Sequence, residues 1–197
     1  MGNQFDERDR ADMERLTAGH DAALNELIEC HAAKLFNYLI RCLKNEEDAA
    51  DAGQEAFVRV YQHRAKFDAS QKFTTWLYAI ATNLVKDHYR YRTRHPQISL
   101  DTEHDQTDGD LGTRLAHPDS TPRDSLETTE RLAAIRKSVA ALPEELRAPL
   151  ILAEYEETPH AEIAKILGCS LKAVETGIYR AREQLRASLN DLLLKEG

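Results

Sequence analysis

Several features that mark common classes of protein are absent from this sequence of 197 residues. Its three cysteines, Cys30, Cys42 and Cys169, are an odd number at scattered positions, so no disulfide framework is indicated. A zinc site from Cys30, His31 and Cys42 is an alternative that their spacing disfavours. No apolar run is long enough to span a membrane, and the start Met1–Gln4 lacks the apolar segment of a signal peptide. We therefore expect a cytoplasmic protein without a metal or other cofactor.

The sequence also lacks the motifs of common enzyme classes and the pattern of β-strands. It contains no Gly-rich phosphate loop, no nucleophile elbow and no zinc-protease helix. No run that alternates apolar and polar residues is long enough for a strand. The net charge of −8 argues against a protein that coats nucleic acid with its whole surface. We predict an all-α protein that is not an enzyme.

What the sequence contains is two helical blocks on either side of a polar linker. The predicted boundaries are residues 1–94, a linker over residues 95–124, and residues 125–197. The linker is rich in Pro, Gly, Asp, Thr and Ser, so it has little apolar surface whose burial would offset the entropy lost on ordering. We interpret the linker as a solvated tether. Alternatively, its carboxylates mimic phosphates and repel stray nucleic acid.

Capping residues and helical periodicity locate the elements within these blocks. Asp21 and Asn45 are the expected N-caps of the first two helices, because short polar side chains accept hydrogen bonds from the first turn. In the third helix Trp76 is expected to pack inward rather than to stack on a base. In the second block Pro143 suits the first turn of a helix, whereas Pro149 should kink that helix or remove one of its hydrogen bonds.

The most specific local motif is a helix-turn-helix over Thr158–Arg182. Gly168 breaks the apolar pattern of the first helix, and Ser170 can cap the second. The inward face of the second helix is expected to hold Val174, Ile178, Ala181 and Leu185. The residues expected to face a DNA groove are Ser170, Lys172, Ala173, Thr176, Arg180 and Arg182. A packing hairpin without function is the alternative interpretation.

Motifs in both blocks occur in a distinctive order. The stretch DAADAGQE at 48–55 is followed by FTTWLYAIATNLVKDHYR at 73–90, and after the linker comes the helix-turn-helix. Together they resemble the extracytoplasmic-function (ECF) group of bacterial RNA polymerase sigma factors over about residues 22–94 and 125–189. The resemblance implies sigma domains two and four, which bind core RNA polymerase, melt the minus-ten element and recognise the minus-thirty-five element. It also implies an anti-sigma factor as a partner.

A helix-turn-helix regulator that acts without polymerase is the rival hypothesis, but it leaves the motifs of the first block unexplained. Under the resemblance, one helix of domain two would present an acidic surface to the polymerase clamp, with Phe57 and Val60 as apolar anchors. The core-binding residues are then Asp48, Asp51, Gln54, Glu55 and Phe57. A solvated helix face is the alternative interpretation of this charge run.

The minus-ten site is placed at a polar loop and the helix that follows it. An unstacked base needs an aromatic surface or a pocket, and an Asn amide offers both a donor and an acceptor to a base edge. Tyr78 and Asn83 are expected to be the exposed candidates on that helix. The full predicted set is Ser70, Gln71, Lys72, Phe73, Tyr78, Asn83, Lys86 and Arg90. The basic tract Lys86, His88, Arg90, Arg92 and Arg94 has an alternative interpretation as a helix end whose side chains extend to solvent.

The recognition helix departs from the family's usual pattern at two positions. Glu175 and Gly177 lie where the family often carries cationic residues. A glutamate can still accept a hydrogen bond from a cytosine amine, whereas a glycine lowers helix stability by about 1 kcal/mol relative to alanine. We therefore expect phosphate contacts from Arg180 and Arg182 and make no assignment of promoter sequence.

Overall fold

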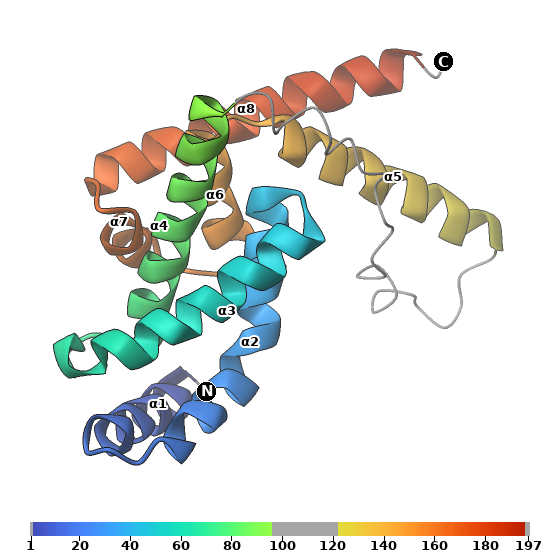
Figure 1. Cartoon of the computed structure of the whole chain (residues 1–197). Coiled ribbons are helices and arrows are strands. Elements are labelled where there is room, and N and C mark those ends of the chain that lie inside the picture. The colour runs from blue at the N-terminus through green and yellow to red at the C-terminus, as the bar shows by residue number, and fades with distance from the viewer. Residues whose placement is uncertain (1, 96–121, 196–197) are drawn as a thin grey trace.

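The computed structural model describes residues 2–95 and 122–195, and within them the chain is all-α, as predicted (Figure 1). Eight α-helices and one 3-10 turn make up these ranges, and no strand occurs in them. The helices are α1 (Gly2–Thr17), α2 (Ala22–Leu43), α3 (Glu46–His63), α4 (Phe73–Arg94), α5 (Pro122–Ala141), α6 (Glu144–Glu154), α7 (His160–Leu167) and α8 (Leu171–Lys195), with the 3-10 turn at Arg64–Lys66. No helix of the described ranges is long and apolar enough to cross a membrane.

Helices α1–α4 form the N-terminal block, whose ends follow local sequence signals. Asn45 caps α3, because its Oδ1 accepts a hydrogen bond from the Asp48 amide at 2.8 Å. Lys44 ends α2 in the left-handed conformation with φ 63°. Asp21 precedes α2 as expected, but it has helical dihedrals and its side chain makes no capping bond, so the predicted cap is wrong.

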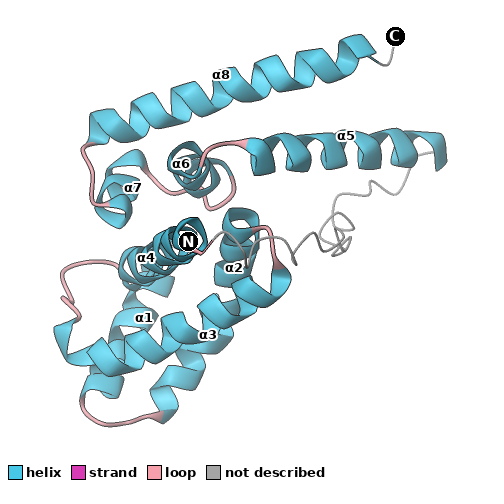
Figure 2. Ribbon diagram, turned by 45° about the horizontal axis from the view of Figure 1, so that its top comes forward, coloured by secondary structure: helices cyan, strands magenta, loops and turns pink. Residues whose placement is uncertain are grey.

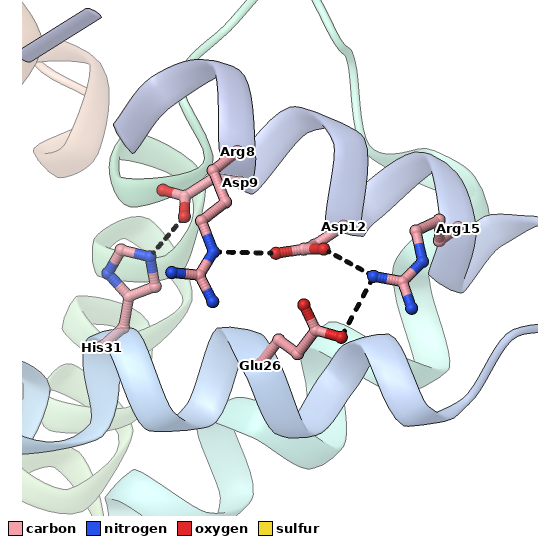
Figure 3. Close-up of polar contacts among 6 residues, drawn as sticks. All are labelled: Arg8, Asp9, Asp12, Arg15, Glu26 and His31. Atoms are coloured by element: carbon pink, nitrogen blue, oxygen red, sulfur yellow. Dashed lines mark hydrogen bonds and ion pairs between the residues drawn. The ribbon is translucent and has the colours of Figure 1, made fainter. Parts of the chain in front are cut away.

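Helix α1 is an element that the periodicity of its charged sequence did not predict. Met13 and Leu16 are buried against the rest of the block, and two carboxylates are buried with them. Asp9 Oδ1 lies 2.9 Å from His31 Nε2, and Asp12 accepts a hydrogen bond from Arg15 at 3.1 Å (Figure 3). The same Arg15 reaches Glu26 of α2 at 3.1 Å. Polar pairs therefore accompany the apolar contacts that hold α1 on α2.

The core of the N-terminal block lies between α2, α3 and α4. Near its centre the hydroxyl groups of the buried Tyr38 and Thr82 are 2.8 Å apart. The Thr82 hydroxyl donates to the Tyr78 carbonyl at 2.7 Å and accepts from Tyr38, so both buried hydroxyls are hydrogen-bonded. The fully or nearly buried apolar residues of these three helices include Leu27, Leu35, Leu39, Ala49, Ala56, Val60, Leu77, Ala81 and Val85.

Helices α5–α8 form the C-terminal block. Pro143 is the N-cap of α6, and Pro149 is buried inside that helix. Gly168 closes α7 with φ 65°, and the Ser170 hydroxyl accepts a hydrogen bond from the Ala173 amide at 3.2 Å, as predicted for the turn between α7 and α8. Val174, Ile178 and Ala181 of α8 are buried and Leu185 packs against the core, also as predicted.

The two blocks pack directly against each other. Helix α7 lies on α4 and α6 lies on α2, so the C-terminal block forms a layer over the N-terminal one (Figure 2). Helix α5 begins at Pro122, inside the segment expected to be linker, and residues 96–121 lie outside the described ranges. The sequence predicted two domains joined by a tether, but it contained no signal for this contact.

Candidate functional site

The surface of α3 matches the predicted polymerase-binding strip only in part. Asp51 and Gln54 are exposed, and Glu55 pairs with Arg59 at 2.9 Å. The expectation of apolar anchoring by Phe57 is wrong, because this ring is buried in the core, and Val60 is buried with it. Asp48, in the first turn of the helix, is half-buried, and its Oδ2 lies 3.6 Å from His88 Nε2.

Sequence reasoning missed the apolar residue that α3 does expose. Val58 is 45% exposed and follows Asp51 by seven residues, which is about two helical turns. It therefore lies on the same face as Asp51 and Gln54, where Phe57 had been expected. The spacing i, i+3, i+7 was the available signal for this strip.

The loop before α4 is held by its own hydrogen bonds. The Asp68 carboxylate accepts a hydrogen bond from the Ser70 amide at 2.9 Å, and this bond lowers the pKa of Asp68. The backbone amide of Gln71 donates to the backbone carbonyl of Asp68 at 3.0 Å. Ser70 and Lys72 are exposed and Gln71 is half-buried, so these three side chains are accessible from the loop.

The aromatic residues around this loop pack inward. Phe73 is 2% exposed, so its assignment to the base-binding surface is wrong. Its ring centroid lies 5.2 Å from that of His31 and 6.4 Å from that of Trp76. Phe67 packs on Trp76 at 5.2 Å, and Trp76 is partly buried against the core, as expected.

On α4 the predicted minus-ten residues separate into exposed and engaged groups. Asn83 and Arg90 are exposed, and Arg90 lies 3.4 Å from Asp87. Tyr78, which was expected to be exposed, is 8% exposed and donates a hydrogen bond to Glu156 at 2.8 Å. Burial of this side chain raises the pKa of Tyr78. The ammonium of Lys86 donates to the Leu167 carbonyl at 3.3 Å.

The outward face of α8 carries the predicted minus-thirty-five residues. All six of them are exposed, from Ser170 to Arg182. Arg182 donates to Glu154 of α6 at 3.1 Å, so its charge is partly compensated within the block. Tyr179, which sequence reasoning missed, is 65% exposed on this helix beside Arg180.

Gly177 does not leave a gap on the outward face. The residue is buried, and a Cβ atom added there would lie 3.5 Å from Pro149 Cγ of α6. The position therefore faces α6, where a Cβ atom would make an ordinary van der Waals contact with Pro149. Glu175 is exposed.

The two predicted DNA-binding faces meet at one groove. This groove has a volume of about 780 Å³ and lies between α4, α6 and the first turns of α8. Its cationic lining residues are Lys86, Arg90, Lys172 and Arg180, and Glu144 and Glu145 of α6 line it as well. Burial raises the pKa of Glu144, against the lowering effect of Arg147. No group of three potential metal ligands occurs in the described part of the chain.

The chain matches two family profiles. The sigma-70 region 2 profile matches residues 27–95, and the sigma-70 region 4 profile matches residues 132–185. The ECF RNA polymerase sigma factor SigW of Bacillus subtilis is 33% identical over 91% of this chain and 96% of that protein. The RNA polymerase sigma-H factor of Pseudomonas aeruginosa is 30% identical over 95% of this chain and 96% of that protein.

Solved structures share the fold. The structure of CnrH in complex with the cytosolic domain of CnrY has a TM-score of 0.67 and 24% identity, and the match covers 93% of this chain and 98% of that one. The sigma factor RpoE of Bartonella quintana, in complex with the anti-sigma factor NepR, has a TM-score of 0.66 and 19% identity. That match covers 84% of this chain and 96% of that one.

Proposed function

Because the chain belongs to the ECF group of the sigma-70 family, we propose that its two helical blocks divide promoter recognition between them. The protein is an RNA polymerase sigma factor, an initiation factor and not an enzyme. In our proposal residues 1–94 act as sigma domain two and residues 125–197 as sigma domain four. The observation that supports this division is one chain with an acidic strip on α3 and a basic helix-turn-helix on α7–α8.

The core-binding surface that we propose is the strip formed by Asp51, Gln54 and Glu55, together with Val58. Carboxylates on an exposed helix face attract basic side chains of a partner. An apolar side chain beside them adds apolar surface that is buried when the partner binds. Asp48 stands at the edge of this strip, near His88. Phe57 supports the helix from the core side.

The minus-ten surface that we propose comprises Ser70, Gln71, Lys72, Asn83, Lys86 and Arg90. The lysines and the arginine supply attraction to phosphates, and the amides of Gln71 and Asn83 suit base edges. The buried residues Phe73 and Tyr78 hold the loop and α4 in place rather than receive a base.

The minus-thirty-five surface that we propose is the first half of α8. Ser170, Lys172, Ala173 and Thr176 lie at the end of the helix that enters a major groove in helix-turn-helix proteins. Arg180 supplies a phosphate contact. Arg182 can contribute only when it leaves Glu154. We further propose that the protein acts in the cytoplasm, where the polymerase is, and that an anti-sigma factor restrains it.

A charge-matched pair of variants tests the assignment of the acidic strip. In the first variant Asp51→Asn is combined with Glu55→Gln, and in the second Glu46→Gln is combined with Glu47→Gln on the same helix. Both remove two negative charges from exposed or half-exposed positions. We expect the first variant to bind core polymerase about tenfold or more weakly and the second to bind it nearly as the wild type does.

Transcription from a promoter of the protein's own locus is the second measurement. Core polymerase with the wild-type chain should initiate there, and neither component should do so alone. Binding of promoter DNA without any binding of core polymerase at micromolar concentration would support the rival hypothesis of a regulator that acts without polymerase.

A further inference from the structure

The loop proposed to receive the minus-ten element, residues 67–72, depends on contacts outside itself for its position. Within the loop, the side chain and the backbone carbonyl of Asp68 accept hydrogen bonds from the backbone amides of Ser70 and Gln71, at 2.9 and 3.0 Å. These two bonds shape the turn, but they do not attach it to the rest of the N-terminal block. The attachment is made at its two ends, where the 3-10 turn precedes it and α4 follows it.

Helix α1 makes one contact at each end of this loop. The hydroxyl of Thr17, the last residue of α1, donates to the Arg64 carbonyl of the 3-10 turn at 3.4 Å. At the other end, Asp6 Oδ2 lies 3.5 Å from Lys72 Nζ, which also lies 3.1 Å from Glu162 Oε1. Residues 6 and 17 are about 16 Å apart along the helix axis, so α1 spans the base of the loop. We call the contacts of Thr17 with Arg64 and of Asp6 with Lys72 the brace.

The brace belongs to a helix that is itself fixed in the N-terminal block. Met13 and Leu16 of α1 are buried in the core. Asp9 Oδ1 lies 2.9 Å from His31 Nε2 of α2 (Figure 3), and the centroid of the His31 ring lies 5.2 Å from that of Phe73 at the start of α4. The two contacts of the brace are therefore held at a fixed separation by one anchored helix.

A fixed loop and a loosely attached loop differ in the entropy that they lose when a base binds. A loop that becomes ordered only on binding loses conformational entropy at that moment, whereas a loop that is ordered in advance does not. The brace therefore favours the binding of an unpaired base without any contact between α1 and DNA. Helix α1 ends before residue 27, where the region 2 profile begins, so this contribution comes from outside the matched segment.

We propose that α1 is a positioning element for promoter melting: Asp6 and Thr17 fix the two ends of the loop, so that Ser70 and Gln71 are held in the conformation that receives an unpaired base. The inference rests on the assignment of residues 70–72 to the minus-ten element made above. Asp6 and Thr17 are positioning residues, which act on DNA through the loop. Loss of the brace weakens binding of the unpaired strand about three- to tenfold and leaves the affinity for core polymerase unchanged.

The test uses three variants of the full chain. The brace variant combines Asp6→Asn with Thr17→Val, which removes the charge and the hydroxyl that make the two contacts. The conservative variant combines Asp6→Glu with Thr17→Ser, which keeps both groups. The control, Glu14→Gln, removes one negative charge from an exposed position of the same helix. Equal thermal midpoints establish that the proteins are equally folded, and Asp6→Asn alone, at a half-buried position, replaces the brace variant if its midpoint is lower.

The first measurement is the affinity of each polymerase complex for labelled single strands that span the minus-ten element of a promoter of the protein's own locus. We expect the brace variant to bind about three- to tenfold more weakly than the control, and the conservative variant to bind as the wild type does. Equal affinities of the brace variant and the control would overturn this inference and leave the proposed function intact. A wild-type complex that bound neither strand would contradict the proposed minus-ten surface, and the inference would fail with it.

The second measurement separates positioning through the loop from a general effect of α1 on the block. In a background of Ser70→Ala with Gln71→Ala, the brace substitutions should have little further effect on strand binding, because the side chains that they position are absent. In an Asn83→Ala background their effect should persist, since Asn83 lies on α4 and not on the loop. Equal effects of the brace substitutions in the two backgrounds would show that α1 does not act through the loop and would overturn the proposal.

Discussion

Asp9 of α1 and His31 of α2 form a buried pair in which the imidazole Nε2 lies 2.9 Å from the carboxylate Oδ1. The pair joins a helix outside both family profiles to the first helix of the profile that begins at residue 27. On its other side the His31 ring packs 5.2 Å from that of Phe73, at the start of α4. The contact therefore links α1 through α2 to the end of the loop proposed to receive the minus-ten element.

Loss of this pair should destabilise the N-terminal block. Asp9→Ala leaves the buried imidazole of His31 without its partner, which we expect to lower the free energy of unfolding by about 1–3 kcal/mol. The measurement is the midpoint of urea unfolding. Arg10→Ala, at an exposed position of the same helix, is the control and should change the midpoint little. An Asp9→Ala protein as stable as the control would show that the pair with His31 does not hold α1 in place.

The two predicted helix caps should respond differently to the same substitution. Asn45→Ala removes a side chain that accepts a hydrogen bond from the Asp48 amide, at a cost of about 1 kcal/mol. Asp21→Ala removes a side chain that makes no capping bond, so we expect a change below about 0.5 kcal/mol. Urea unfolding measures the change in the free energy of unfolding of both variants, provided that the m-value is unchanged. A larger effect at Asp21 would contradict the observed geometry.

Promoter melting should depend on Asn83. This residue is exposed on α4, so Asn83→Ala should leave the fold intact and remove an amide proposed to contact an unpaired base. Loss of one base contact costs about 1–3 kcal/mol, and the open complex should fall about five- to hundredfold where its population is small. Permanganate reactivity of unpaired thymines measures this, and a promoter already mismatched across the melted segment should recover part of the loss. Wild-type reactivity would remove Asn83 from the melting step.

The arginines of α8 should differ in their contribution to duplex binding. Arg180→Ala in the polymerase complex should reduce the slope of log affinity against log salt by about one, because one phosphate contact is lost. Arg182→Ala should reduce it less, since Arg182 is partly compensated by Glu154. Arg186→Ala, whose guanidinium pairs with Glu183 in the same helix, is the control. If Arg182→Ala lowered the slope as much as Arg180→Ala, the Glu154 contact would not persist on DNA.

Stability should fall in mildly acidic solution because of His88. Burial lowers the pKa of this imidazole below its usual 6.5, against the opposing effect of Asp48, and its Nε2 makes no hydrogen bond. Between the folded and unfolded pKa values the unfolded chain binds more protons, so stability declines as the pH falls below about 6.5. His88→Gln should show a smaller decline in urea midpoint between pH 7.5 and 5.5. An identical decline in both proteins would assign it to other groups.

Short-range signals determined several of the helix boundaries. Asn45, Gly168 and Ser170 end or begin helices through bonds and dihedral angles that involve only their neighbours in the chain, so the sequence alone located these boundaries. The inward face of α8 followed from helical periodicity for the same reason. The family resemblance, which rests on local motifs in order, was confirmed by both profile matches.

The tertiary structure alone decided which of the candidate side chains reach the surface. Tyr78 and Phe57 are aromatic residues that a helix can turn either way. Packing of α4 against α2 and α7 buries Tyr78, and packing of α3 against α2 and α4 buries Phe57. Asp9 is buried only because His31 is placed opposite it by a different helix. The contact of Glu156 and Glu162 with α4 joins residues about 80 positions apart, and no local property of either segment encodes such a contact. Burial and long-range pairing depend on the whole arrangement of helices, because each is a property of two surfaces and not of one.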